Sequence, residues 1–224
     1  MSIDHPSDSV LRPFLGVKER RRSSFAKRAL GDDLGVAKDA HFAKALSKHG
    51  VTEVVFSARA LKLNHRDELK HRILVVSDVG VVLLDEISKR VRRKFAWKDV
   101  SEVRLSVHAD DFFALIAPDE YDVLLACNRK TEAIVAMRKM WKRDVTRRGG
   151  MDARGGGGET ELRVTASERF TYMASALRER RVEFTRVDGG DVDIDVVDVD
   201  DARDEDERGD DDRARLRRPS DEIV

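Results

Sequence analysis

Six basic side chains lie in one short stretch between two segments that alternate like β-strands: Lys62, His65, Arg66, Lys70, His71 and Arg72. Side chains two residues apart on a strand point to the same face, so Lys70 and Arg72 project together, and Lys62 faces them from the partner strand. Ammonium and guanidinium groups donate charge-assisted hydrogen bonds to phosphate oxygens. The spacing therefore predicts a hairpin that holds a polyphosphorylated group, with His65 and Arg66 at its tip. A solvated loop in a charge-rich chain is the alternative that these residues leave open.

The elements that must position this hairpin follow from the hydrophobic period. Seven runs have a period of two and are rich in β-branched residues: Val51–Leu63, His71–Ser77, Val79–Asp85, Val91–Trp97, Glu102–Val107, Phe112–Ala117 and Tyr121–Ala126. Short strands with frequent polar breaks are typical of an antiparallel barrel or sandwich. The period then becomes helical. Asn128 is the expected N-cap, and Ile134, Met137, Trp141 and Val145 form one apolar stripe that ends near Arg148. We expect this helix to cap the open end of the barrel.

The flanking segments are predicted more coarsely. Before the strands, the pattern predicts helices over about 17–30 and 36–48, each followed by a glycine that favours a helix end. After the helix, Gly155–Gly158 has no following Gly-Lys-Ser/Thr, so we interpret 149–158 as a flexible connector rather than a nucleotide-binding loop. Strands over 161–165 and 182–187, around a short helix within 167–178, complete the prediction. The fold class is α+β.

The charges are strongly segregated along the 224 residues. Formal net charge is zero and 38% of residues are charged, compared with about 25% in an average globular chain. From Asp188 to Val224 there are sixteen acidic residues and six arginines, so residues 1–187 carry a net charge of +10 and the tail −10. The tail has no aromatic residue, and we expect 188–224 to be disordered, like residues 1–9. It could cover the basic face or only add solubility.

Several classes of function find no residues to support them. Cys127 is the single cysteine, so a disulfide framework is excluded and a reducing compartment is favoured. No apolar run approaches the ~20 residues of a membrane span, and there is no signal peptide or prenylation motif, so we expect any membrane contact to be peripheral. The histidines lack metal-ligand spacing, and no nucleophile–base–acid set stands out. Asp191, Asp193 and Asp195 begin like a calcium loop, but Val196 replaces its glycine. We expect no enzyme activity, metal or cofactor.

A secondary basic patch is the weaker candidate site. Its residues are Arg20, Arg21, Arg22, Lys89 and Arg90. The first three could be a lipid contact or a kinase target, but an exposed helix face is the favoured interpretation. The last two lie with Arg92, Arg93 and Lys94 at a turn that could border the same pocket as the hairpin.

Taken together, the motifs resemble the tail homology 1 (TH1) domain of class I myosins. The matching stretches are LRPFLGVKERRRSSF with the following GDDLG, VVFSARALKLNHRDELKHRILVVSD, and VSEVRLSVHADDFFALIAPDEYDVLLAC before the helix. The family has a tyrosine where this chain has Asp33. The similarity covers roughly Val10 to Val187. No motor or light-chain-binding motif accompanies it.

The resemblance implies a membrane-binding domain over 10–187 with a pleckstrin-homology-like core at about 51–148. It also implies that Lys62, Lys70 and Arg72 are phosphoinositide-binding cations and that the protein is cytoplasmic, on the inner face of membranes. Anionic phospholipid is the expected partner, and actin-cytoskeleton or myosin-associated proteins are further candidates. A protein-interaction platform stays open as the alternative function. Nucleic-acid binding through phosphates is a less favoured alternative. Stacking on single-stranded bases is disfavoured, because the aromatic content is only 6% and lies mostly in apolar runs.

Overall fold

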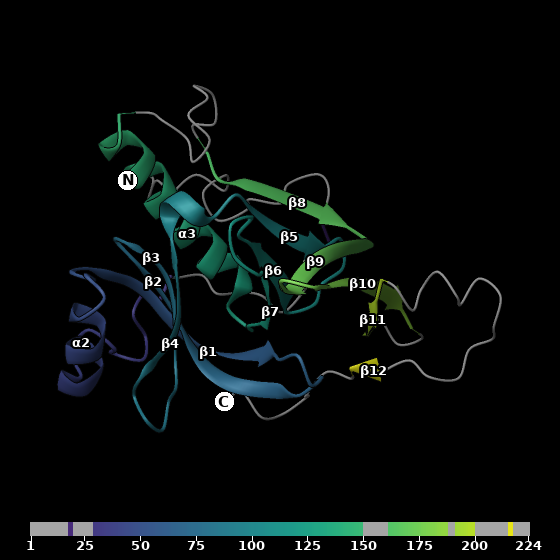
Figure 1. The fold of residues 1–224 in the computed structure, drawn as a ribbon, viewed down its shortest axis with the longest axis horizontal. Helices are drawn as coiled ribbons and strands as arrows, with labels where there is room; N and C mark the ends of the chain where they lie inside the picture. Colours follow the sequence, from purple (N-terminus) through teal and green to yellow (C-terminus); the bar gives the residue numbers. More distant parts are fainter. Residues whose placement is uncertain (1–17, 20–28, 150–160, 188–190, 200–214, 217–224) are drawn as a thin grey trace, which may run out of the picture.

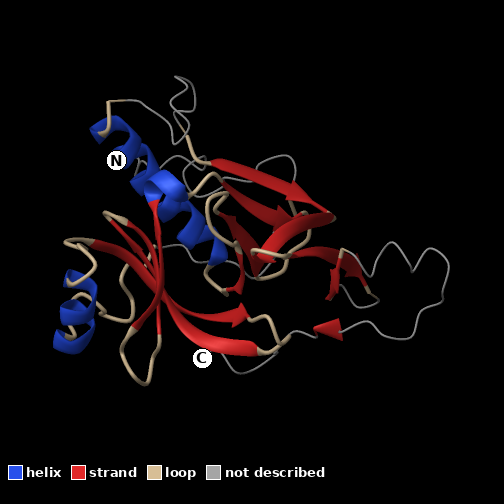
Figure 2. Ribbon diagram, in the orientation of Figure 1, coloured by secondary structure: helices blue, strands red, loops and turns tan. Residues whose placement is uncertain are grey.

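The described residues form one large open β-sheet, two α-helices, a short 3-10 helix (Trp97–Asp99) and a smaller second sheet (Figures 1 and 2). The computed structural model describes residues 18–19, 29–149, 161–187, 191–199 and the backbone of 215–216. The strands of the large sheet are β1 (Val54–Leu63), β2 (Leu69–Ser77), β3 (Gly80–Leu84), β4 (Val91–Ala96), β5 (Glu102–Ser106), β6 (Phe112–Ile116), β7 (Val123–Ala126) and β8 (Arg163–Ser167). All seven predicted strands are present, within about three residues of their expected ends.

The sheet is open, so the expectation of a closed barrel is wrong. Its strand order is β4-β3-β2-β1-β7-β6-β5-β8. Closure would require β4 to pair with β5, but β5 instead pairs in parallel with β8, from Glu102 opposite Arg163 to Ser106 opposite Ser167. A strand can pair on only two sides, and β6 takes the other side of β5. The two halves of the sheet meet between β1 and β7 through two residue pairs, Leu61 with Ala126 and Lys62 with Leu125.

Helix α3 (Lys130–Arg147) fills the space between the two halves of the sheet (Figure 1). Its predicted apolar stripe is buried, and it packs against inward-facing side chains of both halves. We call the sheet face that contacts α3 the concave face. The helix begins two residues after the predicted Asn128 cap. The N-cap position is taken by Arg129, whose side chain does not cap the helix. Its guanidinium donates to the backbone oxygens of Ser57 (2.8 Å) and Gly31 (3.2 Å).

The opposite, convex face of β2 and β3 is covered by helix α2 (Ala40–Ser47). The Asp39 carboxylate caps this helix by accepting from the backbone N–H groups of His41 (2.9 Å) and Phe42 (3.1 Å). The helix begins later than the predicted residue 36. The N–H groups of Val36 and Ala37 donate to the carboxylate of Asp32, which holds this segment as a turn. Most of the predicted helix over 17–30 lies outside the described residues, and its described ends are not helical.

A second sheet covers the convex face of the other half. It comprises β9 (Arg169–Ser175), β10 (Arg178–Arg186), β11 (Val192–Asp198) and β12 (Arg215–Leu216), in the order β12-β11-β10-β9. Its inward side chains, including Phe170, Phe184 and Ile194, pack against Phe112 and Leu124 of the large sheet. This sheet completes a second hydrophobic core.

The second sheet corrects two predictions. The segment 167–178, expected to contain a short helix, belongs mostly to β9, which pairs with β10 from Glu183 opposite Arg169 onward. The acidic segment expected to be disordered contains β11. Asp193 and Asp195 alternate with apolar residues, so Ile194 and Val196 are buried while these two carboxylates lie on the other face. In this segment, burial of every second side chain stabilises a strand in spite of the high charge. The other predicted disordered or connector segments, 1–9 and most of 149–158, lie outside the described residues.

Candidate functional site: a basic hairpin at the rim of the sheet

The register of β1 and β2 places the three principal cations on one face. Lys62 lies directly opposite Lys70, and Ala60 lies opposite Arg72. Directly opposed residues share a face, as do residues two apart, so Lys62, Lys70 and Arg72 project together. Further along the same rows, Ala58 and Leu74 belong to the core beneath α3. The cations therefore continue the concave face beyond the hydrophobic core, at its rim.

The structure adds Arg93 and Tyr121 to this rim. Arg93 lies opposite Leu83 on the same concave face. Its guanidinium carbon is 4.1 Å from the centre of the Phe95 ring and 3.5 Å from that of the Tyr121 ring, and Lys62 Nζ is 5.9 Å from the Tyr121 ring. Sequence reasoning placed Arg93 only at the border of the pocket. The sequence did contain a signal for its position: Arg93 lies two residues before the apolar Phe95, so the two side chains point to the same face of the strand.

Arg93 is held rather than free. Nη1 donates to the backbone oxygen of Asp122 (3.3 Å), and Nη2 donates to Glu120 Oε2 (3.2 Å) and to the backbone oxygen of Tyr121. Its side chain is only 8% exposed. These bonds fasten the loop between β6 and β7 against β4 and fix the Tyr121 ring beside Lys62.

The three principal cations differ in how their charge is compensated. Lys70 Nζ pairs with Glu68 Oε2 at 2.8 Å, and both side chains are about half exposed. Arg72 Nη1 lies 3.4 Å from Asp85 Oδ2. Lys62 is half-buried, and no carboxylate of the described residues forms an ion pair with it. Burial, with smaller contributions from Arg93 and Arg72, lowers the pKa of Lys62. Of the three, Lys62 has the charge that the described residues compensate least.

Asp85 anchors the rim from the turn between β3 and β4. Its carboxylate accepts from the backbone N–H of Ser88 (2.9 Å) and from its hydroxyl (2.8 Å), and it pairs with Arg92 at 3.2 Å as well as with Arg72. The hydrogen bonds from Ser88 come first among the causes that lower the pKa of Asp85 to about 2. Asp85 is therefore ionised at neutral pH and orients Arg72.

The loop at the tip of the hairpin is fixed by its own side chains and by the second sheet. Asn64 Oδ1 accepts from the N–H groups of Arg66 (2.8 Å) and Glu68 (2.9 Å). Arg178 Nη1 donates to the backbone oxygen of His65 (2.5 Å), and Arg180 pairs with Asp67. The side chains of His65 and Arg66 are exposed. The loop thus presents them to solvent from a rigid backbone.

A small pocket of about 170 Å³ lies beside this loop, between the hairpin, the start of β7 and β9. Lys62, His65 and Tyr121 line it on the hairpin side, and Tyr172 and Ser175 line it on the side of the second sheet. The two sheets therefore share one rim at this end of the molecule.

The structure separates Lys89 of the secondary patch from the hairpin cations. Lys89 Nζ binds Asp39 Oδ2 at 2.5 Å and lies 4.6 Å from the Phe42 ring, against α2 on the convex side. Arg90 is exposed at the same turn, and its backbone oxygen accepts from Asp85 N. The other three residues of the patch, 20–22, lie outside the described residues.

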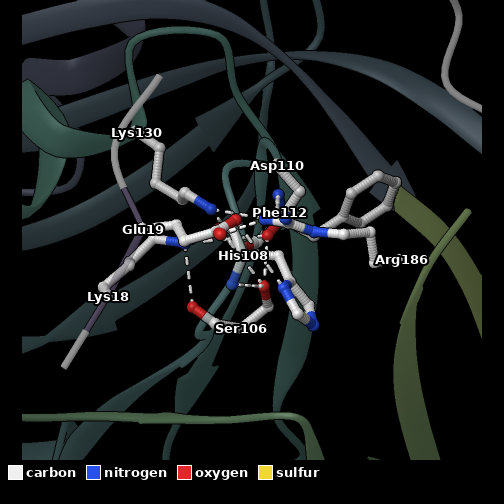
Figure 3. A network of polar contacts seen from close by, with 8 residues as sticks. All are labelled: Lys18, Glu19, Ser106, His108, Asp110, Phe112, Lys130 and Arg186. Carbon is white, nitrogen blue, oxygen red and sulfur yellow. Dashed lines mark hydrogen bonds and ion pairs between the residues drawn. The ribbon is translucent and has the colours of Figure 1, made fainter. Parts of the chain in front are cut away.

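A second cationic cluster, which sequence reasoning missed, is buried at the β5–β6 end (Figure 3). Lys130 Nζ donates to Asp110 Oδ1 (2.9 Å) and to the backbone oxygen of Phe112 (3.0 Å). Lys18 Nζ donates to the backbone oxygen of Ser106 (2.8 Å) and lies 3.7 Å from Asp110 Oδ2. The three charged side chains are each no more than 5% exposed. Nothing in the sequence distinguished these lysines from the many solvated ones.

The electrostatics of this buried cluster follow from two ammonium groups that share one carboxylate. Burial, followed by the charge of Lys130, lowers the pKa of Lys18 to about 7. Burial alone would raise the pKa of Asp110, but Lys130 and Lys18 outweigh it and lower that pKa. The cluster fastens Lys18 to the sheet, and the neighbouring Glu19 N–H donates to the backbone oxygen of Val107.

The fold and the rim define a module that presents basic side chains on an open sheet, and comparison with known proteins assigns its family. The family model of the unconventional myosin tail, described as actin- and lipid-binding, matches residues 20–201. The chain therefore belongs to this family and is a class I myosin TH1 domain. The match extends past Val187, where we expected the domain to end, and includes β11.

Two relatives come from Dictyostelium discoideum. The myosin ID heavy chain is 26% identical over 138 residues, which is 56% of this chain and 12% of that protein. The myosin IB heavy chain is 23% identical over 184 residues, which is 79% of this chain and 15% of that protein. The chain thus spans only a small part of these heavy chains. In the part of the chain that the structure describes, no helix is both long and apolar enough to cross a bilayer.

Proposed function

We propose that the rim of the β1–β2 hairpin binds the phosphorylated head group of a phosphoinositide on a cytoplasmic leaflet. The observation that carries the proposal is the register that puts Lys62, Lys70 and Arg72 on one face, with Lys62 half-buried and lacking a carboxylate partner among the described residues. Phosphate oxygens would accept charge-assisted hydrogen bonds from these ammonium and guanidinium groups. Arg72, already oriented by Asp85, offers a planar pair of N–H groups. The exposed His65 and Arg66 add attraction to the anionic surface.

The test is a double substitution, Lys62→Ala with Arg72→Ala, assayed by vesicle sedimentation. Losing two charged donors removes about 1.5–3 kcal/mol each. At about 1.4 kcal/mol per decade, affinity for phosphoinositide vesicles should fall a hundredfold or more. Unfolding stability should change little, because these side chains lie at the rim rather than in the core.

The matched control removes the same number of charges elsewhere, with Lys89→Ala and Arg90→Ala. Binding to phosphoinositide vesicles and to charge-matched phosphatidylserine vesicles should then weaken alike, by about 1 kcal/mol per residue at most. Equal losses by both double variants on both kinds of vesicle would show a diffuse basic surface and no head-group site.

The family description also names actin, and we propose actin filaments as a second partner of this domain. Co-sedimentation with filaments, with and without phosphoinositide vesicles, tests this. No pelleting above background at physiological salt would contradict it.

A further inference from the structure

Leu177 lies at the tip of the tight turn between β9 and β10, and its side chain is 94% exposed. Burying a leucine side chain is worth about 1.5–3 kcal/mol, so a fully exposed one at a tip is available to an apolar environment. The neighbouring Ala176 is exposed as well.

The turn is fastened to the candidate lipid site. The next residue, Arg178, donates to the backbone oxygen of His65 (2.5 Å) and makes two bonds to the Asp198 carboxylate, at 2.7 and 2.6 Å. Arg180 pairs with Asp67 of the hairpin loop and, at 3.1 Å, with Asp198. A network of charge-assisted bonds therefore fastens the turn that carries Leu177 to the hairpin loop that carries His65 and Arg66.

The surface between the β9–β10 turn and the loop of the β1–β2 hairpin is amphipathic. Tyr121 is 42% exposed and lines the pocket shared by His65 and Ser175, while Lys62 lies at its inner edge. Apolar and aromatic side chains surrounded by cations match the boundary between phosphate groups and acyl chains in an anionic membrane.

We propose that Leu177 enters the interface of the same anionic leaflet whose head groups meet the β1–β2 hairpin, so that the second sheet is a direct membrane contact. This inference rests on the proposed function. The clamp through Arg178 and Asp198 sets the spacing between the apolar tip and the basic loop, and both reach the membrane together.

Vesicle sedimentation of Leu177→Ser provides the first test. Affinity for phosphoinositide vesicles should fall about tenfold, because an apolar contact of roughly the size of one leucine is lost, while the preference over phosphatidylserine is kept. Ile87→Ser is the matched control: Ile87 is 95% exposed at the β3–β4 turn, two residues before Lys89, which is bound to α2. Its affinity should change less than about twofold. Equal losses in both variants would overturn the inference.

A fluorescent probe gives the second test. The single native cysteine, Cys127, is buried, and burial raises its pKa to about 12, so a new cysteine can be labelled selectively. An environment-sensitive dye on Leu177→Cys should shift to the blue on phosphoinositide vesicles and be quenched by brominated acyl chains, and the same dye on Ile87→Cys should not. Vesicle binding with an unshifted dye at position 177 overturns this inference alone. A shifted dye without phosphoinositide dependence overturns the head-group site alone.

Discussion

Two groups of basic side chains among the described residues, one at the rim and one at the β5–β6 end, differ mainly in burial. At the rim, Arg72 lies 3.4 Å from Asp85, and Lys62 forms an ion pair with no carboxylate of the described residues. At the β5–β6 end, Lys18 and Lys130 are almost fully buried, and each donates to backbone oxygens as well as facing Asp110. Buried ammonium groups need every hydrogen bond satisfied, whereas exposed ones remain available to a ligand.

The comparison teaches that charge alone does not locate a binding site. Removing one partner of a buried ion pair leaves an uncompensated charge in the interior, whereas an exposed pair is worth little. Substitutions in the buried cluster should therefore act on stability, and those at the rim should act on binding.

The largest expected effect is that of Lys130→Met. It leaves the buried Asp110 without its 2.9 Å partner and the backbone oxygen of Phe112 without a donor. The free energy of unfolding should fall by about 3–5 kcal/mol. Urea unfolding measures this, and a change below about 1 kcal/mol would mean that the buried cluster is no more structural than the rim.

A smaller effect concerns pH. The pKa of Lys18 is lowered to about 7 in the folded chain from 10.5, so between these values the unfolded state binds more protons. Stability should therefore rise with pH across this window, by about 1.4 kcal/mol per unit at most. The Lys18 ammonium faces Lys130, Asp110 and the backbone oxygens near His108, while Glu19 pairs with Arg186.

The measurement compares unfolding of the wild type and Lys18→Met between pH 7 and pH 9. The rise should be present in the wild type and absent from the variant. If the stability of the wild type and of Lys18→Met depended on pH in the same way, the buried Lys18 would not be the cause of the rise.

The smallest expected effect is at the rim, in Glu68→Gln. The pair of Glu68 with Lys70 is exposed, so stability should change by no more than about 0.5 kcal/mol. Releasing Lys70 should strengthen binding to anionic vesicles a few-fold, since each cation near the surface contributes about 1 kcal/mol. Weaker binding by this variant would show that Glu68 orients Lys70 usefully instead of competing for it.

The sequence by itself determined the local elements. Alternation in runs such as Phe112–Ala117 and the helical stripe through Trp141 are set by neighbours in the chain, so seven strands and α3 could be predicted. The shared face of Lys62, Lys70 and Arg72 was also predictable, because a short hairpin fixes its own register and side chains alternate along each strand.

Only the tertiary structure decided what depends on partners distant in sequence. Whether the sheet closes depended on β8, which follows α3 and occupies the free side of β5. The strand in the acidic tail forms because Ile194 and Val196 find a core built by β6, β7 and β10. The roles of Lys18, Lys130 and Arg93 likewise followed from burial, since a lysine or arginine carries the same charge in sequence whether it will face solvent or a buried carboxylate.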